Sequence, residues 1–220
     1  MMSSTSILRR ERLARFASAG IYLVITEEFT AGRGTLETLK MAADGGIKLV
    51  QLREKHLPKR DLYFLAESFR KVCDEYGILM MMNDHLDIAL SVGADGVHLG
   101  QDDLPLEAAL RLTSDLIIGR STHSREEALA EQSAGAPAIN LGPIYATGTK
   151  SLPMAPTGLD LITSVKDDLH IPFSVMGGIK ARHIPELRER GANLIAMVTE
   201  ITQAPDVTGK VKELLALMGK

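Results

Sequence analysis

The chain has 220 residues, of which 45% are hydrophobic and 24% charged, and its formal net charge at pH 7 is −3. This length suits one domain of the larger α/β kinds, and the lack of a basic excess excludes the electrostatic footprint of a nucleic-acid-binding protein. The single cysteine, Cys73, excludes an internal disulfide and a cysteine-cluster metal site, and it favours a reducing, cytoplasmic setting.

The first 20 residues predict a short helical extension and no targeting segment. Residues 6–12 lack the apolar centre of a signal peptide, and Glu11 argues against a transit peptide. No apolar run approaches the ~20 residues that a membrane-spanning helix needs. We therefore expect a helix that caps the bottom of the fold, and no membrane partner.

Eight short apolar runs, rich in β-branched residues, predict strands. Their apolar character is continuous rather than alternating, which is typical of strands that are covered on both faces. The runs comprise residues 21–25, 47–53, 78–82, 96–99, 116–119, 138–141, 171–176 and 193–198.

Amphipathic stretches between these runs predict helices. The clearest one places Cys73 on an apolar stripe, and Ser124 followed by Glu127 is typical of a capping box. Eight strand–helix units at nearly even spacing predict an α/β protein of one domain, residues 1–220, with a single parallel (β/α)₈ TIM barrel and a short N-terminal helix within residues 1–20. A doubly wound open sheet is the alternative, but no Gly-x-Gly-x-x-Gly follows the first run.

Polar residues follow the second predicted strand, at the barrel end where such folds carry their active sites. Period-two alternation puts Gln51, Arg53 and Lys55 on one face, so two cations would point into the barrel mouth. A solvated charge run is the alternative for an isolated Arg-x-Lys. Complementary groups at the other strand ends favour a site.

Two carboxylates from neighbouring strand ends, Asp84 and Asp103, predict a Mg²⁺ site that phosphate oxygens would complete. Each could instead cap the helix that follows it, and both roles could coexist. Asp102 is a spare carboxylate that the sequence alone does not rank below Asp103.

The ends of the fifth and sixth strands add hydroxyls and a further cation. Ser121 could bind a heterocycle, whereas His123 lacks the partners of a catalytic triad. The loop after the sixth strand carries Thr147, Thr149 and Lys150, and could close over a polyanion.

The loops after strands seven and eight form the recurrent phosphate site of this fold. Gly178 follows the seventh predicted strand, and Val198 and Thr199 lie at the end of the eighth. Glycine lets backbone N–H groups approach an anion closely, so these residues predict a phosphate cradle.

Taken together, these motifs resemble those of the thiamine phosphate synthase family over about residues 21–203. The strings that carry the resemblance are Val50-Gln51-Leu52-Arg53-Glu54-Lys55, Asn83-Asp84, Ala94 to Asp103, Gly119 to His123, Leu141-Gly142-Pro143, Thr147 to Lys150 and Gly177-Gly178-Ile179.

The resemblance implies an enzyme that joins hydroxymethylpyrimidine diphosphate to a thiazole phosphate, giving thiamine phosphate and pyrophosphate, with Mg²⁺ as cofactor. It assigns Mg²⁺ to Asp84 and Asp103, and catalytic charge stabilisation to Arg53, Lys55 and Lys150. The pyrimidine diphosphate ligands would be Gln51, Arg53, Lys55, Asn83, Ser121 and Lys150. The thiazole phosphate ligands would be Thr147, Thr149, Gly178, Val198 and Thr199.

Three positions depart from the family pattern. Glu27 follows the first strand where Asp is common, His85 stands where Arg usually follows Asn-Asp, and Glu200 follows Thr199 where a small residue is common. A carboxylate beside a phosphate cradle is unfavourable unless it points away.

Two other functions fit the same fold: a thiazole tautomerase, and a non-catalytic phosphometabolite-binding barrel. The tautomerase would not need the full diphosphate set. We expect small-molecule partners and no nucleic acid, and the sequence leaves homo-oligomerisation open.

Overall fold

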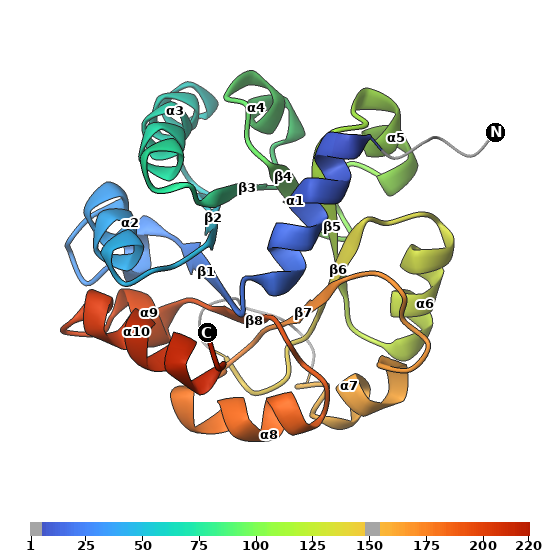
Figure 1. Cartoon of the computed structure of the whole chain (residues 1–220). Helices are drawn as coiled ribbons and strands as arrows, with labels where there is room; N and C mark the ends of the chain where they lie inside the picture. The colour runs from blue at the N-terminus through green and yellow to red at the C-terminus, as the bar shows by residue number, and fades with distance from the viewer. Residues whose placement is uncertain (1–5, 148–154) are drawn as a thin grey trace.

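The computed structural model describes residues 6–147 and 155–220, so the predicted site residues Thr149 and Lys150 lie outside the described part of the chain. Eight parallel strands form a closed barrel in sequence order, and β1 pairs with both β2 and β8 (Figure 1). Helices surround the barrel. The predicted TIM barrel is confirmed.

The strands are shorter than most of the helices that connect them. They are β1 (Ile21–Ile25), β2 (Leu49–Leu52), β3 (Leu79–Asn83), β4 (Gly96–Leu99), β5 (Ile117–Thr122), β6 (Ala138–Leu141), β7 (Phe173–Val175) and β8 (Ile195–Met197). The α-helices are α1 (Ile7–Ser18), α2 (Thr35–Asp44), α3 (Lys59–Tyr76), α4 (Leu86–Ser91), α5 (Leu106–Leu112), α6 (Arg125–Ser133), α7 (Asp160–Val165), α8 (Ile184–Glu189), α9 (Thr199–Thr202) and α10 (Val207–Leu217). Two 3₁₀ helices are η1 (Glu27–Phe29) and η2 (Ala181–His183).

The apolar residues form two cores, one outside the strands and one inside the barrel. Along β2, Val50 and Leu52 pack in the outer core against the helices, whereas Leu49 belongs to the inner core. Gln51, on the same face as Leu49, lies one layer further toward the carboxyl end. The alternation predicted for this strand is confirmed, and it directs the polar residues that follow into the barrel mouth.

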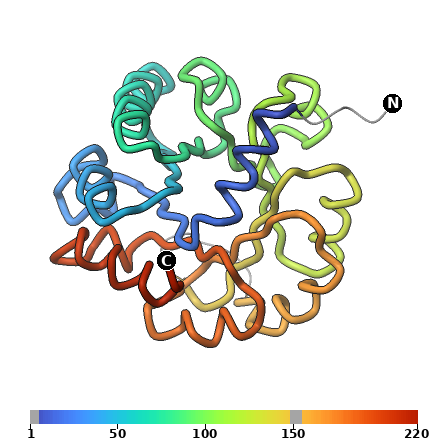
Figure 2. Tube along the Cα trace, in the orientation of Figure 1, coloured from blue at the N-terminus to red at the C-terminus, as the bar shows by residue number. Residues whose placement is uncertain are grey.

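Helix α1 covers the N-terminal end of the barrel (Figures 1 and 2). Phe16 of α1 is buried in the inner core, and its ring packs edge-on against the Tyr22 ring, with 5.7 Å between the ring centroids. Asp95, just before β4, accepts hydrogen bonds from Arg12 of α1, Arg70 of α3 and the Met80 N–H. The predicted N-terminal helix therefore covers this end of the barrel, opposite the carboxyl ends of the strands.

Local details refine several of the predicted elements. β7 begins at Phe173 rather than at residue 171, because Pro172 has no N–H to donate to a ladder. Ser124 caps α6 by accepting from the Glu127 N–H, while the Glu127 carboxylate accepts from the His123 N–H, one residue outside the predicted box.

Burial raises the pKa of the Cys73 thiol to about 12, as suits a core cysteine. In the described chain, no helix combines the length and apolar character that a bilayer span needs.

Candidate active site

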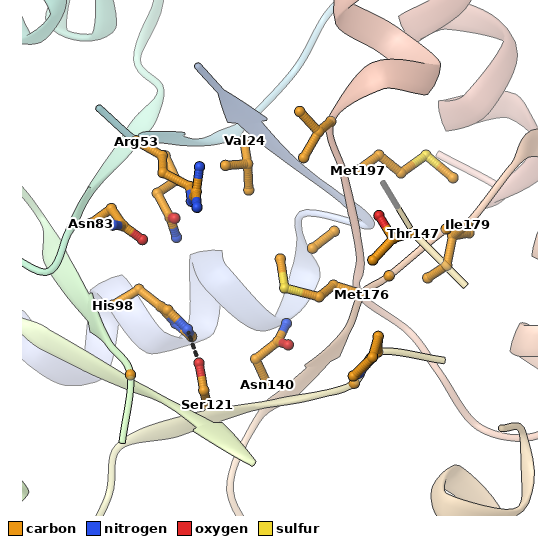
Figure 3. A pocket seen from close by; sticks show the side chains of 18 of the residues that line it. Val24, Arg53, Asn83, His98, Ser121, Asn140, Thr147, Met176, Ile179 and Met197 are labelled. Atoms are coloured by element: carbon orange, nitrogen blue, oxygen red, sulfur yellow. Dashed lines mark hydrogen bonds between the residues drawn. The ribbon is translucent and has the colours of Figure 1, made fainter. Parts of the chain in front are cut away.

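A cavity of about 560 Å³ opens at the carboxyl ends of the strands, and residues from all eight strand ends or the loops after them line it. Its two sides differ in chemistry (Figure 3). Polar side chains gather on the side of β2–β5, and the opposite side, made by β6–β8, is more apolar. The residues labelled in the figure include Arg53, Asn83, His98 and Ser121 on the first side, and Thr147, Ile179 and Met197 on the second.

The floor of the polar side is made by Gln51. This residue is 2% exposed, and its Nε2 donates to the Tyr22 hydroxyl at 2.5 Å. Burial raises the pKa of Tyr22, so this hydroxyl stays neutral. Because the Nε2 atom bonds Tyr22, the Oε1 atom of Gln51 is the side-chain acceptor that could bind a ligand. Arg53, two residues on, lines the same cavity.

Lys55 and Asp84 form an ion pair at the rim, with 2.6 Å between Lys55 Nζ and Asp84 Oδ2. Asp84 adopts a left-handed backbone conformation, with φ at 63°, which is uncommon for a residue other than glycine. Such strain concentrates at functional sites, and here it accompanies a carboxylate that lines the cavity.

Neither predicted metal ligand caps a helix. α4 begins after His85 and α5 after Pro105, and neither helix has a side-chain cap. Asp103 instead accepts from the Gly100 N–H through Oδ2 at 2.6 Å, and it lines the cavity together with Asp84. The capping alternative is therefore wrong for both, and each carboxylate keeps oxygen lone pairs that no described donor uses.

The described residues contain no cluster of three or more His, Cys, Asp or Glu side chains arranged to hold a metal ion. A Mg²⁺ ion needs no such cluster, because it usually takes one or two carboxylates and completes its octahedron with phosphate oxygens and water. The hard oxygen donors of Asp84 and Asp103, both on the cavity, fit that requirement.

His98 and Ser121 form a polar pair on the wall, with 2.9 Å between Nε2 and Oγ (Figure 3). Ser121 was predicted as a ligand, whereas His98 was quoted only as part of a motif. Its inward position follows from the alternation along β4. A Cβ on Gly119 would lie 2.9 Å from His98 Nδ1, so glycine on the neighbouring strand makes room for the ring.

The β6 side contributes a second polar pair that the sequence analysis missed. Asn140 Nδ2 donates to Ser174 Oγ at 2.7 Å inside the barrel, and Asn140 lines the cavity. The inward alternation from Ala138 could have indicated it. Thr147, which was predicted, also lines the cavity, as does His123, whose ring bonds the Gly142 carbonyl oxygen.

The predicted phosphate cradle lies where β7 and β8 end. Gly178 has φ of +61°, and a Cβ there would come within 2.2 Å of the Ala146 carbonyl oxygen, so only glycine allows this approach of two loops. Val198 and Thr199 line the same part of the cavity. Lys180 and Glu200 also line it, and the sequence analysis had not predicted Lys180 as a site residue.

Comparison with known proteins decides the family. The model of the family described as thiamine monophosphate synthase matches residues 21–201. The chain belongs to the thiamine monophosphate synthase family. Every predicted site residue falls within the matched span.

Family members are similar over their full lengths. A thiamine-phosphate synthase of Pelotomaculum thermopropionicum is 41% identical over 97% of this chain and 99% of its own. One of Shouchella clausii is 42% identical over 90% of this chain and 95% of its own. A solved structure, thiamine phosphate pyrophosphorylase from Pyrococcus furiosus, has a TM-score of 0.85 and 30% identity, covering 94% of this chain and 98% of its own. Thiamine-phosphate synthase activity, that of a transferase in thiamine biosynthesis, is the function that membership of the family supports.

Proposed function

We propose that the protein condenses hydroxymethylpyrimidine diphosphate with a thiazole phosphate, and releases thiamine phosphate and pyrophosphate. The observation that carries the proposal is the convergence of Arg53, Lys55, Asp84 and Asp103 on one side of one cavity. These residues come from three separate strand ends, and together they provide cations for a polyanion and oxygen ligands for its metal ion.

The diphosphate is assigned to the rim of the polar side. Arg53 and Lys55 would contact its oxygens, and Asp84 and Asp103 would hold Mg²⁺. When bound, Mg²⁺ supplies positive charge to the diphosphate oxygens. Lys55 already pairs with Asp84, so its ammonium group would lie beside both the metal ligand and the diphosphate. Lys150, outside the described residues, remains a predicted third cation.

The pyrimidine ring is assigned to the floor below. The Oε1 of Gln51, left by the bond from Nε2 to Tyr22, is placed to accept from an exocyclic amino group. Asn83, 7% exposed, and the Ser121–His98 pair provide further polar partners on the wall.

The thiazole phosphate is assigned to the opposite side, where Met176, Met197 and Ile179 provide apolar contacts. Its phosphate would meet the backbone at Gly178, Val198 and Thr199 and the side chain of Thr147, all of which line the cavity. Thr149, outside the described residues, remains a predicted ligand. In this assignment the two substrates would face each other across the cavity.

In the proposed reaction, the bond between the pyrimidine methylene carbon and the diphosphate oxygen breaks, and its electron pair leaves with pyrophosphate. The aminopyrimidine delocalises the positive charge, and the cations of the rim stabilise the departing anion. The thiazole nitrogen then donates its lone pair to the methylene carbon, held in line by its phosphate. No proton is lost in these steps, so no protein base is required.

The decisive experiment is an assay of pyrophosphate release with both substrates and Mg²⁺. We expect release that depends on each component and yields thiamine phosphate. Binding of both substrates without release would support a non-catalytic binding barrel. Isomerisation of a thiazole phosphate without pyrophosphate release would support a tautomerase.

A further inference from the structure

The phosphate end of the cavity contains an ion pair that the function proposed above does not use. Lys180 and Glu200 both line the cavity, beside Gly178 and Thr199, and Lys180 Nζ lies 3.2 Å from Glu200 Oε2. The Ala181 N–H also donates to Glu200 Oε1 at 3.1 Å. Glu200 thus occupies the Lys180 ammonium, which lines the expected anion site, and the N–H of the next residue.

A hydrogen bond to His183 fixes the backbone of Lys180. Its N–H donates to His183 Nδ1 at 3.1 Å, and the His183 ring stacks on Tyr145 with centroids 4.1 Å apart. Burial, with a contribution from Arg182, lowers the pKa of His183, so the ring is neutral and can accept this bond. The backbone of Lys180 is therefore fixed, while its ammonium group remains partly exposed at the cavity.

The described residues of this half of the cavity carry one positive and one negative charge. Among the described residues that line it on the β6–β8 side, Lys180 is the only lysine or arginine and Glu200 is the only carboxylate. The Glu200 side chain is 16% exposed and that of Lys180 is 40% exposed. A partly exposed ammonium has three donors, so it can keep Glu200 and still contact an incoming phosphate.

We infer that Lys180 is a phosphate-contacting residue for the thiazole substrate, and that Glu200 is the counter-charge that limits how tightly this phosphate binds. The inference rests on the proposed function, because it assumes that a phosphomonoester occupies the β7–β8 side. It accounts for a carboxylate beside a phosphate cradle: Glu200 is directed toward Lys180 and the Ala181 N–H.

The test measures thiazole phosphate binding by calorimetry, and KM values by pyrophosphate release. For Lys180→Met we expect binding weakened about tenfold, the scale of one charge-assisted hydrogen bond. For Glu200→Gln we expect binding tightened about threefold to fivefold, because a nearby negative charge is removed while the acceptor for Ala181 remains. The unphosphorylated thiazole alcohol should bind both variants as it binds the unaltered protein.

The control pair is Lys59 and Asp87, an exposed ion pair on α3 and α4 that does not line the cavity. Lys59→Met and Asp87→Asn should leave thiazole phosphate binding unchanged. The KM for the pyrimidine diphosphate should stay constant in all four variants, which verifies that the barrel is intact.

Either of two results with the variants overturns the inference: weaker thiazole phosphate binding in Glu200→Gln, or equal effects on the phosphate and the alcohol. The first would make Glu200 a group that positions Lys180, and the second would give the pair a purely structural role. Failure of the proposed function gives a different result, because the unaltered protein would then release no pyrophosphate. Calorimetry would still measure thiazole phosphate binding in the variants, so the inference about Lys180 and Glu200 is tested separately. Absence of thiazole phosphate binding in the unaltered protein overturns both.

Discussion

Asp95 at the N-terminal end of the barrel and Asp84 at the carboxyl end both form ion pairs, but their surroundings differ. Asp95 accepts from two guanidinium groups and from the Met80 N–H, with 13% of its side chain exposed. Among the described residues, the Asp84 carboxylate pairs with Lys55 alone, and the Lys55 side chain is 40% exposed.

The hollows beside the two carboxylates differ in the same way. The one next to Asp95 measures about 220 Å³, and its arginines donate to Asp95 or to carbonyl oxygens such as that of Gly77. The cavity next to Asp84 measures about 560 Å³, and charged groups with donors or lone pairs to spare line it. The charged groups at the N-terminal end pair with one another and hold α1 against the barrel, whereas the charged groups at the mouth are available to ligands. This is the general division between the two ends of a TIM barrel.

The largest effect is expected at the mouth, for Arg53→Ala. Turnover, measured as pyrophosphate release, should fall by about two to three powers of ten, the scale for loss of one group that stabilises developing charge. The melting temperature should hardly change. Arg60→Ala, an exposed arginine of α3, is the control and should keep full turnover. Unchanged turnover in folded Arg53→Ala would remove this residue from the mechanism.

The converse is expected at the N-terminal end, for Asp95→Asn. The half-buried guanidinium groups of Arg12 and Arg70 would lose this counter-charge, although Arg70 keeps its ion pair with Asp74. The free energy of unfolding in urea should therefore fall by about 2 kcal/mol, the scale of a hydrogen bond to a charged group. Turnover per folded molecule should be preserved, because Asp95 does not line the active-site cavity. If stability held while turnover collapsed, the contrast between the two ends would be wrong.

A smaller effect is expected for Asp84→Asn, which keeps the shape of the side chain and removes its charge. The Mg²⁺ concentration for half-maximal turnover should rise about tenfold or more, since even residues behind metal ligands change affinity on this scale. Asp87→Asn, which alters another lysine-paired aspartate outside the cavity, is the matched control. Superimposable metal titrations for the two variants would exclude Asp84 as a ligand.

The smallest effect is expected for Glu54→Gln, at the rim. Burial raises the pKa of Glu54. The hydrogen bond from the Glu27 N–H lowers this pKa in part, and the negative charge of the Glu27 carboxylate raises it further. The folded state therefore holds this proton to higher pH than the unfolded chain does, so ionisation lowers the free energy of unfolding as the pH rises above about 4.5. Glutamine keeps the acceptor for the Glu27 N–H.

The Glu54→Gln variant should therefore be more stable at pH 7 by about 0.5 kcal/mol, a value reduced for partial exposure. At pH 4 the two proteins should unfold alike. Urea unfolding at both pH values measures this. A gain of the same size at both would assign it to packing rather than to charge.

Much of the fold could be predicted because strands covered on both faces are continuously apolar. The predicted runs 21–25, 96–99 and 138–141 agree with β1, β4 and β6 at both ends. The seventh and eighth runs were predicted too long, since hydrophobicity continues past the point where ladder bonding stops. At the site, the alternation of Gln51, Arg53 and Lys55 correctly placed all three on the cavity. The capping alternatives for Asp84 and Asp103 failed, because a short polar residue before a helix satisfies the same local pattern whether or not it bonds the helix.

By itself, the sequence determined the eight strand–helix units, the barrel end that carries the polar residues and the family to which the chain belongs. Periodicity and local motifs suffice for these, because they depend on neighbours along the chain. Only the tertiary structure decided that Tyr22 holds Gln51, that Asp95 fastens α1 and that Glu200 is directed toward Lys180. Each of these contacts joins residues 20 or more positions apart, and their charges and hydrogen bonds become specific only once barrel closure brings them within bonding distance.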